Sequence, residues 1–295
     1  MPRSTTSAGT EPVGRRFAVR SPRRSTVAAL LITELIGALL LVGRGVPPPV
    51  APSAQSAPAA PVATSAGSAE GWPTSSVTLR DGRVAQLVAT GAGSAGLLAR
   101  IAAELDDAAD AVSAFWGPQW RRDIVIVAAA TDEQFAAVGG DGHTAATTTA
   151  RQITFAPRAA AMSTASLRIV LRHELFHYAA RADTAADAPR WLTEGVADYV
   201  ARPSAPVPVG GPVTPSRLPT DADLDGPDRS AAYDRAWSFA RFVADNYGPS
   251  TLRALYRRAC GPGHPDPATA VRDTLGADLD TVQADWRRWL AGGLR

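Results

Sequence analysis

The sequence predicts an α+β fold: a small N-terminal mixed sheet with helices, then a helix that carries two histidines, then an all-helical C-terminal lobe. Short strand-like runs occur only between residues 77 and 155. From residue 163 onwards, apolar residues recur mostly at the spacing of three and four that is typical of helices. Strands that come first and helices that come last, without regular alternation, are typical of α+β folds.

A single hydrophobic segment precedes this domain. Residues 25–43 form a nearly unbroken apolar run, and nineteen helical residues at about 1.5 Å each extend about 28 Å, enough to span a bilayer core. Glu34 near the middle opposes insertion, but the many Leu, Ile and Val residues offset it. We expect a retained transmembrane anchor; the alternative is a signal peptide cleaved near Ala54-Gln55-Ser56.

The segments around the hydrophobic run give the expected orientation. Residues 1–24 contain six arginines and one glutamate, so we expect a disordered cytoplasmic tail and the folded domain outside the cell membrane, or secreted if the segment is cleaved. Residues 44–76 are rich in Pro, Ala and Ser, which is typical of a semi-extended linker. The folded domain is then expected to span residues 77–295.

Charge and cysteine content exclude some classes of protein. The formal net charge is +2, and residues 1–24 contribute +5, so residues 25–295 carry 2 − 5 = −3. A mildly acidic domain argues against a nucleic-acid partner. Cys260 is the only cysteine, so the chain has no internal disulfide.

The expected sheet consists of short strands. Residues 77–79 and 84–88 flank Asp81-Gly82 and predict a β-hairpin, and residues 124–127 predict a buried strand. The alternating, Thr-rich segment 147–155 predicts an edge strand, which could pair with an extended partner chain.

The expected helices follow from apolar periodicity and capping signals. A short helix at 131–138 has Thr131 in the N-cap place and Gln134 in the capping-box place. A second N-cap is expected at Thr193, which would open a helix that carries Glu194. The full set of expected helices is 97–115, 131–138, 163–180, 193–201, 229–247, 249–259, 267–275 and 278–291.

The helix at 163–180 carries the most informative motif. His173 and His177 are four residues apart, so both side chains project from one helix face and can bind one metal ion. Glu174 lies on the same side, where it can contact a metal-bound water rather than the metal. Zinc in catalytic sites takes three protein ligands and a water, and Glu194 is our third candidate ligand.

Two motifs together, Arg172-His173-Glu174-Leu175-Phe176-His177-Tyr178 and Trp191-Leu192-Thr193-Glu194-Gly195-Val196-Ala197-Asp198-Tyr199, resemble the gluzincin zinc metallopeptidases, specifically the peptidase MA-like domains. The resemblance is strongest over residues 168–200. It implies one zinc ion held by His173, His177 and Glu194, with Glu174 as general base. The sixteen residues between His177 and Glu194 are two fewer than is usual in the similar aminopeptidases.

The resemblance implies two further roles. An acid in the place of Asp198 hydrogen-bonds the back nitrogen of the first histidine in gluzincins and fixes its tautomer. A tyrosine or histidine commonly stabilises the oxyanion in this group, and Tyr233, near the start of the helix at 229–247, is our candidate. A tyrosine that only packs against the histidine helix is the equal alternative for Tyr233.

These features predict a zinc peptidase that hydrolyses peptides or proteins outside the cytoplasm, with a zinc-bound water attacking the peptide bond and Glu174 taking its proton. No Gly-x-Met-Glu-Asn-type motif of exopeptidases occurs, so we expect an endopeptidase. The alternative is a zinc-stabilised binding or sensory domain on the cell surface that does not turn over substrate.

Overall fold

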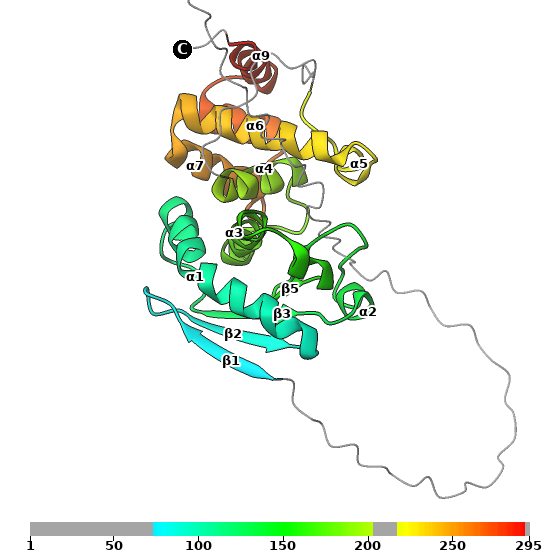
Figure 1. Ribbon diagram of the computed structural model, residues 1–295. Helices are drawn as coiled ribbons and strands as arrows, with labels where there is room; N and C mark the ends of the chain where they lie inside the picture. Colours follow the sequence, from blue (N-terminus) through cyan, green and yellow to red (C-terminus); the bar gives the residue numbers. More distant parts are fainter. Residues whose placement is uncertain (1–72, 203–216, 293–295) are drawn as a thin grey trace, which may run out of the picture. The chain divides into compact units, whose positions relative to one another are not determined.

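The computed structural model describes residues 73–202 and 217–292 of the chain (Figure 1). The expected cytoplasmic tail, hydrophobic segment and nearly all of the linker therefore lie outside the described residues. Within the two described ranges, no helix is long and apolar enough to cross a membrane. The first strand begins at Thr74, three residues before the expected domain start.

The described residues form a mixed five-stranded sheet, followed by a run of helices, as the sequence predicts. The sheet has the order β1-β2-β3-β5-β4, in which β1 and β4 are antiparallel to their neighbours and the inner pairs are parallel. Its strands are β1 (Thr74–Thr78), β2 (Val84–Ala89), β3 (Asp123–Ala128), β4 (Ala146–Thr148) and β5 (Ile153–Phe155). The predicted hairpin is β1–β2.

Successive residues of the inner strands β2 and β3 alternate between buried and less buried positions, so one face of the sheet is buried. In β2, Ala85, Leu87 and Ala89 are buried, whereas the residues between them are half-buried. Helix α1 (Ala95–Trp116) packs on this side with an apolar stripe at helical spacing and ends at Gly117, whose φ of 96° suits glycine. Helix α3 (Thr164–Ala180) packs beside α1 and against β4 and β5, so the histidine helix rests on the sheet.

The expected strand over 147–155 is two strands. β4 and β5 are joined by a tight turn in which Thr149 N–H donates to the carbonyl of Gln152 at 2.9 Å, and the Thr149 hydroxyl accepts from Arg151 N–H and Gln152 N–H at 3.2 Å. Of these two strands, only β4 lies at an edge of the sheet, because β5 lies between β3 and β4. A threonine hydroxyl here replaces the glycine or proline that usually marks such a turn.

The short helix α2 (Asp132–Ala136) has the predicted cap but half of the predicted capping box. The Thr131 hydroxyl accepts from Gln134 N–H. The Gln134 side chain does not reach back to Thr131; its carbonyl accepts from Ala130 N–H at 2.9 Å and from the Thr90 hydroxyl at 2.7 Å. Gln134 therefore ties α2 to the end of β2 instead.

The remaining helices follow the sequence closely, with one addition and one change of start. α5 was not expected, and α4 begins one turn earlier than predicted. The bounds are α4 (Arg190–Ala201), α5 (Asp221–Asp225), α6 (Arg229–Tyr247), α7 (Pro249–Cys260), α8 (Pro267–Leu275) and α9 (Leu279–Leu290). In Figure 1 these helices continue away from the sheet, with α4 between α3 and α6.

The close approach of α4 and α6 depends on Gly195. A Cβ at this position would lie 2.5 Å from the carbonyl oxygen of Ala236, closer than real side chains approach a backbone oxygen. The packing continues outward through edge-to-face aromatic contacts, from Trp191 to Phe239 at 5.4 Å and from Phe239 to Trp286 at 5.5 Å. Gly195 directly follows Glu194, so this packing also fixes where Glu194 sits.

Candidate metal centre

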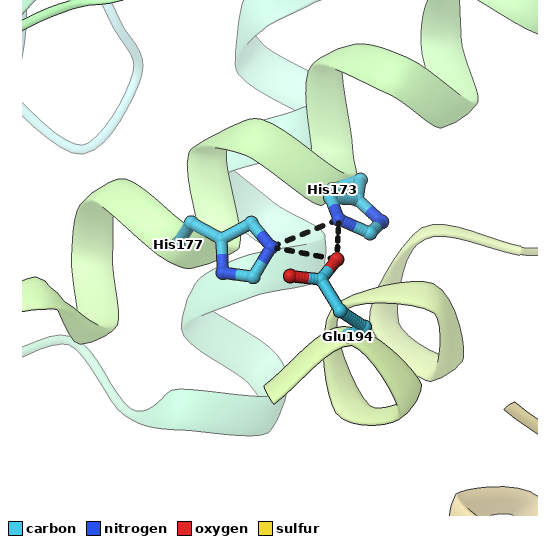
Figure 2. A group of neighbouring side chains, drawn as sticks. All are labelled: His173, His177 and Glu194. Carbon is cyan, nitrogen blue, oxygen red and sulfur yellow. Dashed lines mark hydrogen bonds and ion pairs between the residues drawn. The ribbon is translucent and has the colours of Figure 1, made fainter. Parts of the chain in front are cut away.

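Two imidazoles project from α3 toward α4. The helix is capped by the Ser163 hydroxyl, which accepts from Ser166 N–H. His173 and His177 lie one turn apart on one face, with ring centroids 4.7 Å apart. Their Nε2 atoms lie 2.9 Å from each other (Figure 2).

Glu194 on α4 completes a triangle with these two nitrogens. Its Oε2 lies 3.2 Å from Nε2 of His173 and 3.5 Å from Nε2 of His177. Ligands about 2.1 Å from a tetrahedral zinc ion are separated by about 3.4 Å, so these three spacings, including the 2.9 Å between the imidazoles, suit one shared ion. Within the described residues, His173, His177 and Glu194 are the group of three that can hold a metal.

The helix that carries Glu194 does not begin at Thr193, as the sequence suggested. It begins at Arg190 after Pro189, because Leu192 N–H and Thr193 N–H both donate to the Pro189 carbonyl. The Thr193 hydroxyl instead donates to the carbonyl of Arg190 at 3.1 Å. The extra turn places Glu194 inside the helix, where its backbone is more firmly held than at an N-terminus.

Asp198 lies on α4 one turn after Glu194 and faces the same histidine. Its Oδ1 is 2.9 Å from Nδ1 of His173, and both side chains are completely buried. A carboxylate at this nitrogen holds the proton on Nδ1 and leaves the lone pair of Nε2 for a metal. This is the position that the gluzincin resemblance implies for Asp198.

Glu174 is fully buried beside the two histidines. The Thr148 hydroxyl, from edge strand β4, lies 2.5 Å from Oε2 of Glu174. Oε1 is buried and has no hydrogen-bond partner among the described residues. Burial raises the pKa of Glu174, although the charges of His173 and His177 oppose the shift. One oxygen of this carboxylate is thus anchored, and the other remains an acceptor.

The electrostatics of the three candidate ligands favour a cation. Burial acts against the charge of Glu194, but the charge of His177 and the hydrogen bonds with both histidines outweigh it and hold the pKa of Glu194 well below its usual range. Burial likewise lowers the pKa of His173, but Asp198 and Glu194 raise it to about 10. Both shifts favour positive charge at this site, so a metal ion would compete with a proton for it.

Tyr233 lies on α6, close to the ligand helix. It is buried, and burial followed by the negative charge of Glu194 raises its pKa well above the usual value. The charge of Glu194 therefore acts on the phenol. This places Tyr233 near the candidate ligands, while its part in stabilising an oxyanion stays a prediction.

Two residues near the centre were not singled out by the sequence. Thr148 contacts Glu174 across 26 positions of sequence, and only the folding of β4 onto α3 brings them together. Arg202 contacts Asp198 at 2.6 Å. A spacing of four residues on one helix could have indicated the second pair.

Comparisons with known proteins give limited similarity. No protein-family model and no curated protein matches the chain. A solved structure of an M1 zinc metallopeptidase variant from Deinococcus radiodurans matches with a TM-score of 0.46 and 16% identity over 76% of this chain and 53% of that chain. Structures of a two-domain M1 zinc metallopeptidase bound to L-arginine or to L-tryptophan also match, each with a TM-score of 0.46, at 17% and 18% identity.

These last two matches cover 74% and 76% of this chain but 51% and 52% of the other. The chain therefore spans about half the length of each structure that it resembles. At this level of similarity, the case for a metal centre rests on the geometry of the side chains described above.

Proposed function

We propose that this chain is a zinc-dependent peptidase. The observation that supports it is the arrangement of His173, His177 and Glu194 as a triangle of ligand atoms beside a buried carboxylate, Glu174. Two imidazole nitrogens and one carboxylate oxygen are the donor set of many catalytic zinc sites, in which a fourth position stays open. A purely structural zinc site would be expected to use four protein ligands.

Three residues of the chain have separate roles in the proposed reaction. A zinc ion in this place would polarise the carbonyl of the scissile bond and make a water more acidic. Glu174 then accepts the proton of the attacking water and delivers it to the amine that leaves. Thr148 holds one oxygen of Glu174 while the other takes the proton. Tyr233 is our candidate donor to the oxyanion.

The proposed substrates are extended peptides or protein segments. Strand β4 lies at the edge of the sheet and carries Thr148, so a substrate strand added to this edge would run beside Glu174. We propose cleavage within the chain of the substrate, outside the cytoplasm. The anchored topology that we propose for residues 1–76 would hold the domain at the outer surface of the cell membrane.

Digestion of a diverse peptide mixture tests the proposal. The full-length chain and its Glu174→Gln variant, both loaded with zinc and both checked for zinc content, are incubated with the mixture and the products are read by mass spectrometry. We expect new cuts with the wild type and none with the variant, because an amide cannot accept the proton. A zinc-loaded wild type without Glu174-dependent cuts would favour the zinc-stabilised binding domain and reject the peptidase.

A further inference from the structure

A chain of contacts leads outward from His173 through Asp198 to Arg202. Oδ1 of Asp198 lies 2.9 Å from Nδ1 of His173, and its Oδ2 lies 2.6 Å from Nη2 of Arg202. The side chains of Asp198 and His173 are completely buried, and that of Arg202 is 21% exposed. Among these three residues, Arg202 is thus the one that reaches toward solvent.

The guanidinium is fixed by contacts from two helices. Arg202 is the C-cap that directly follows α4, and its backbone N–H donates to the carbonyl of Asp198 at 2.9 Å. Its Nη1 lies 2.7 Å from Oδ1 of Asp234 on α6, and its Cζ lies 5.0 Å from the ring centroid of Trp237. Arg202 itself has an extended backbone, with φ of −84° and ψ of 133°, the conformation favoured for a residue that precedes a proline in the sequence.

The guanidinium of Arg202 contributes to the charge balance around the candidate ligands. Glu174, Glu194 and Asp198 are three buried carboxylates within one cluster. A divalent cation offsets two of these charges, and the guanidinium of Arg202 offsets the third. A buried charge without a partner is strongly unfavourable, so the loss of Arg202 would remove a charged partner of Asp198 and allow its carboxylate to turn away from His173.

We propose that Arg202 is a positioning residue for the metal centre: it holds Asp198 so that Asp198 fixes His173 for metal binding. The inference rests on the proposed function for its zinc ion, but not on any peptidase activity. Arg202 contacts neither the ligand atoms nor Glu174; it acts on the metal only through Asp198.

The affinity for zinc tests this role directly. The full-length chain and its Arg202→Met, Asp198→Asn and double variants are titrated with zinc in competition with a coloured chelator, and circular dichroism verifies that each is folded. Loss of an outer partner of a metal-binding histidine typically weakens metal affinity by about 10- to 100-fold, which is the change expected for Arg202→Met. In the Asp198→Asn background the same substitution should cause little further loss, since the two residues act in series.

Asp234→Asn is the matched control. This substitution removes the ion pair of Arg202 with Asp234, whose side chain is 59% exposed. It should leave zinc affinity close to that of the wild type. Should Arg202→Met fail to fold, Arg202→Gln, which also lacks the charge, takes its place in the same comparison.

The outcomes separate this inference from the proposed function. Zinc affinity of a folded Arg202 variant equal to the wild type, or losses that simply add to those of Asp198→Asn, would overturn the positioning role while the metal centre stands. A wild-type chain that binds no zinc would overturn both.

Discussion

The hydroxyl of Thr148 lies 2.5 Å from Oε2 of Glu174 and thereby joins the edge strand of the sheet to the helix of the two histidines. The same hydroxyl is 3.2 Å from the backbone carbonyl of Glu174. Because its single proton can serve one acceptor at a time, the shorter contact to the carboxylate is the stronger one. The strand that we propose to guide the substrate therefore also orients the proposed base.

Thr148→Val should slow catalysis without releasing the metal. A hydrogen bond to a charged group contributes about 1.5–3 kcal/mol, and the loss of this amount from the transition state lowers kcat about 10- to 160-fold. KM and zinc content should stay near those of the wild type, since Thr148 touches no candidate ligand. Thr148→Ser keeps the hydroxyl and should recover most of the rate. A loss of zinc in the Val variant, or no recovery with Ser, would contradict the role in orienting Glu174.

Removal of the metal should lower the thermal stability of the domain. The candidate ligands bring together buried groups that a bound ion stabilises, and the ion binds only the folded chain. At a free zinc concentration 100 times the dissociation constant, the gain is about 2.7 kcal/mol, or about 5–10 °C in Tm for a domain of this size. A chelator followed by excess zinc should lower and then restore Tm in a calorimetric scan. An unchanged Tm would argue against a metal at His173, His177 and Glu194.

Gly195→Ala should lower folding stability and weaken zinc binding, because it disturbs the packing of two helices. The added Cβ would meet the backbone of Ala236 at 2.5 Å, so α4 and α6 must move apart. Overpacking of this kind costs about 1–3 kcal/mol, and the movement would also displace the adjacent Glu194. We expect a lower midpoint in denaturant unfolding and weaker zinc retention.

Gly96→Ala is the control for that substitution. Gly96 also lies in a helix, but a Cβ there meets nothing within 4 Å. Alanine should therefore keep or raise stability by up to about 1 kcal/mol, because it is the better helix former. Equal destabilisation by both substitutions would show that close packing at Gly195 is not the cause.

The sequence predicted the helical part of the fold well because helix signals are local. The bounds of α6 and α8 match the predicted 229–247 and 267–275, where apolar spacing and capping residues lie within the element itself. The predicted start of α4 was wrong because that prediction used only the local signal of Thr193. Thr193 is a favoured N-cap residue, but the carbonyl of Pro189 accepts the bonds that extend the helix by a turn.

Contacts between distant segments were the part that the sequence did not reveal. The turn between β4 and β5 is closed by Thr149 within a threonine-rich run that reads as one alternating strand. Thr148 reaches Glu174 only because β4 packs on α3. The pairing of His173 with His177 needed one helix and was predictable, whereas the Thr148 contact depends on sheet register, which a single sequence leaves open.

The single thiol should report on opening of the loop that links the two ligand helices. Cys260 is buried, and burial raises the pKa of its thiol well above the usual value, so little of the reactive thiolate forms in the folded chain near pH 8. Its carbonyl also accepts from Ala185 N–H at 2.7 Å, which ties this end of α7 to the loop between His177 and Glu194.

Labelling of Cys260 by a thiol reagent should therefore require local opening and should be slower with zinc than without it. A metal that bridges α3 and α4 lowers the population of open states in proportion to its affinity. The measurement is the rate of labelling with a chromogenic disulfide at pH 8, for zinc-loaded and chelated protein, with guanidinium-unfolded protein to give the full one-thiol amplitude. Fast labelling of the native chain that zinc does not slow would show that Cys260 is accessible without movement of the ligand loop.

The raised pKa of the Cys260 thiol also predicts how folding stability depends on pH. The native thiol stays protonated above pH 8.5, where the thiol of the unfolded chain ionises. The free energy of unfolding should therefore fall as the pH rises past that point, and Cys260→Ala should weaken this dependence.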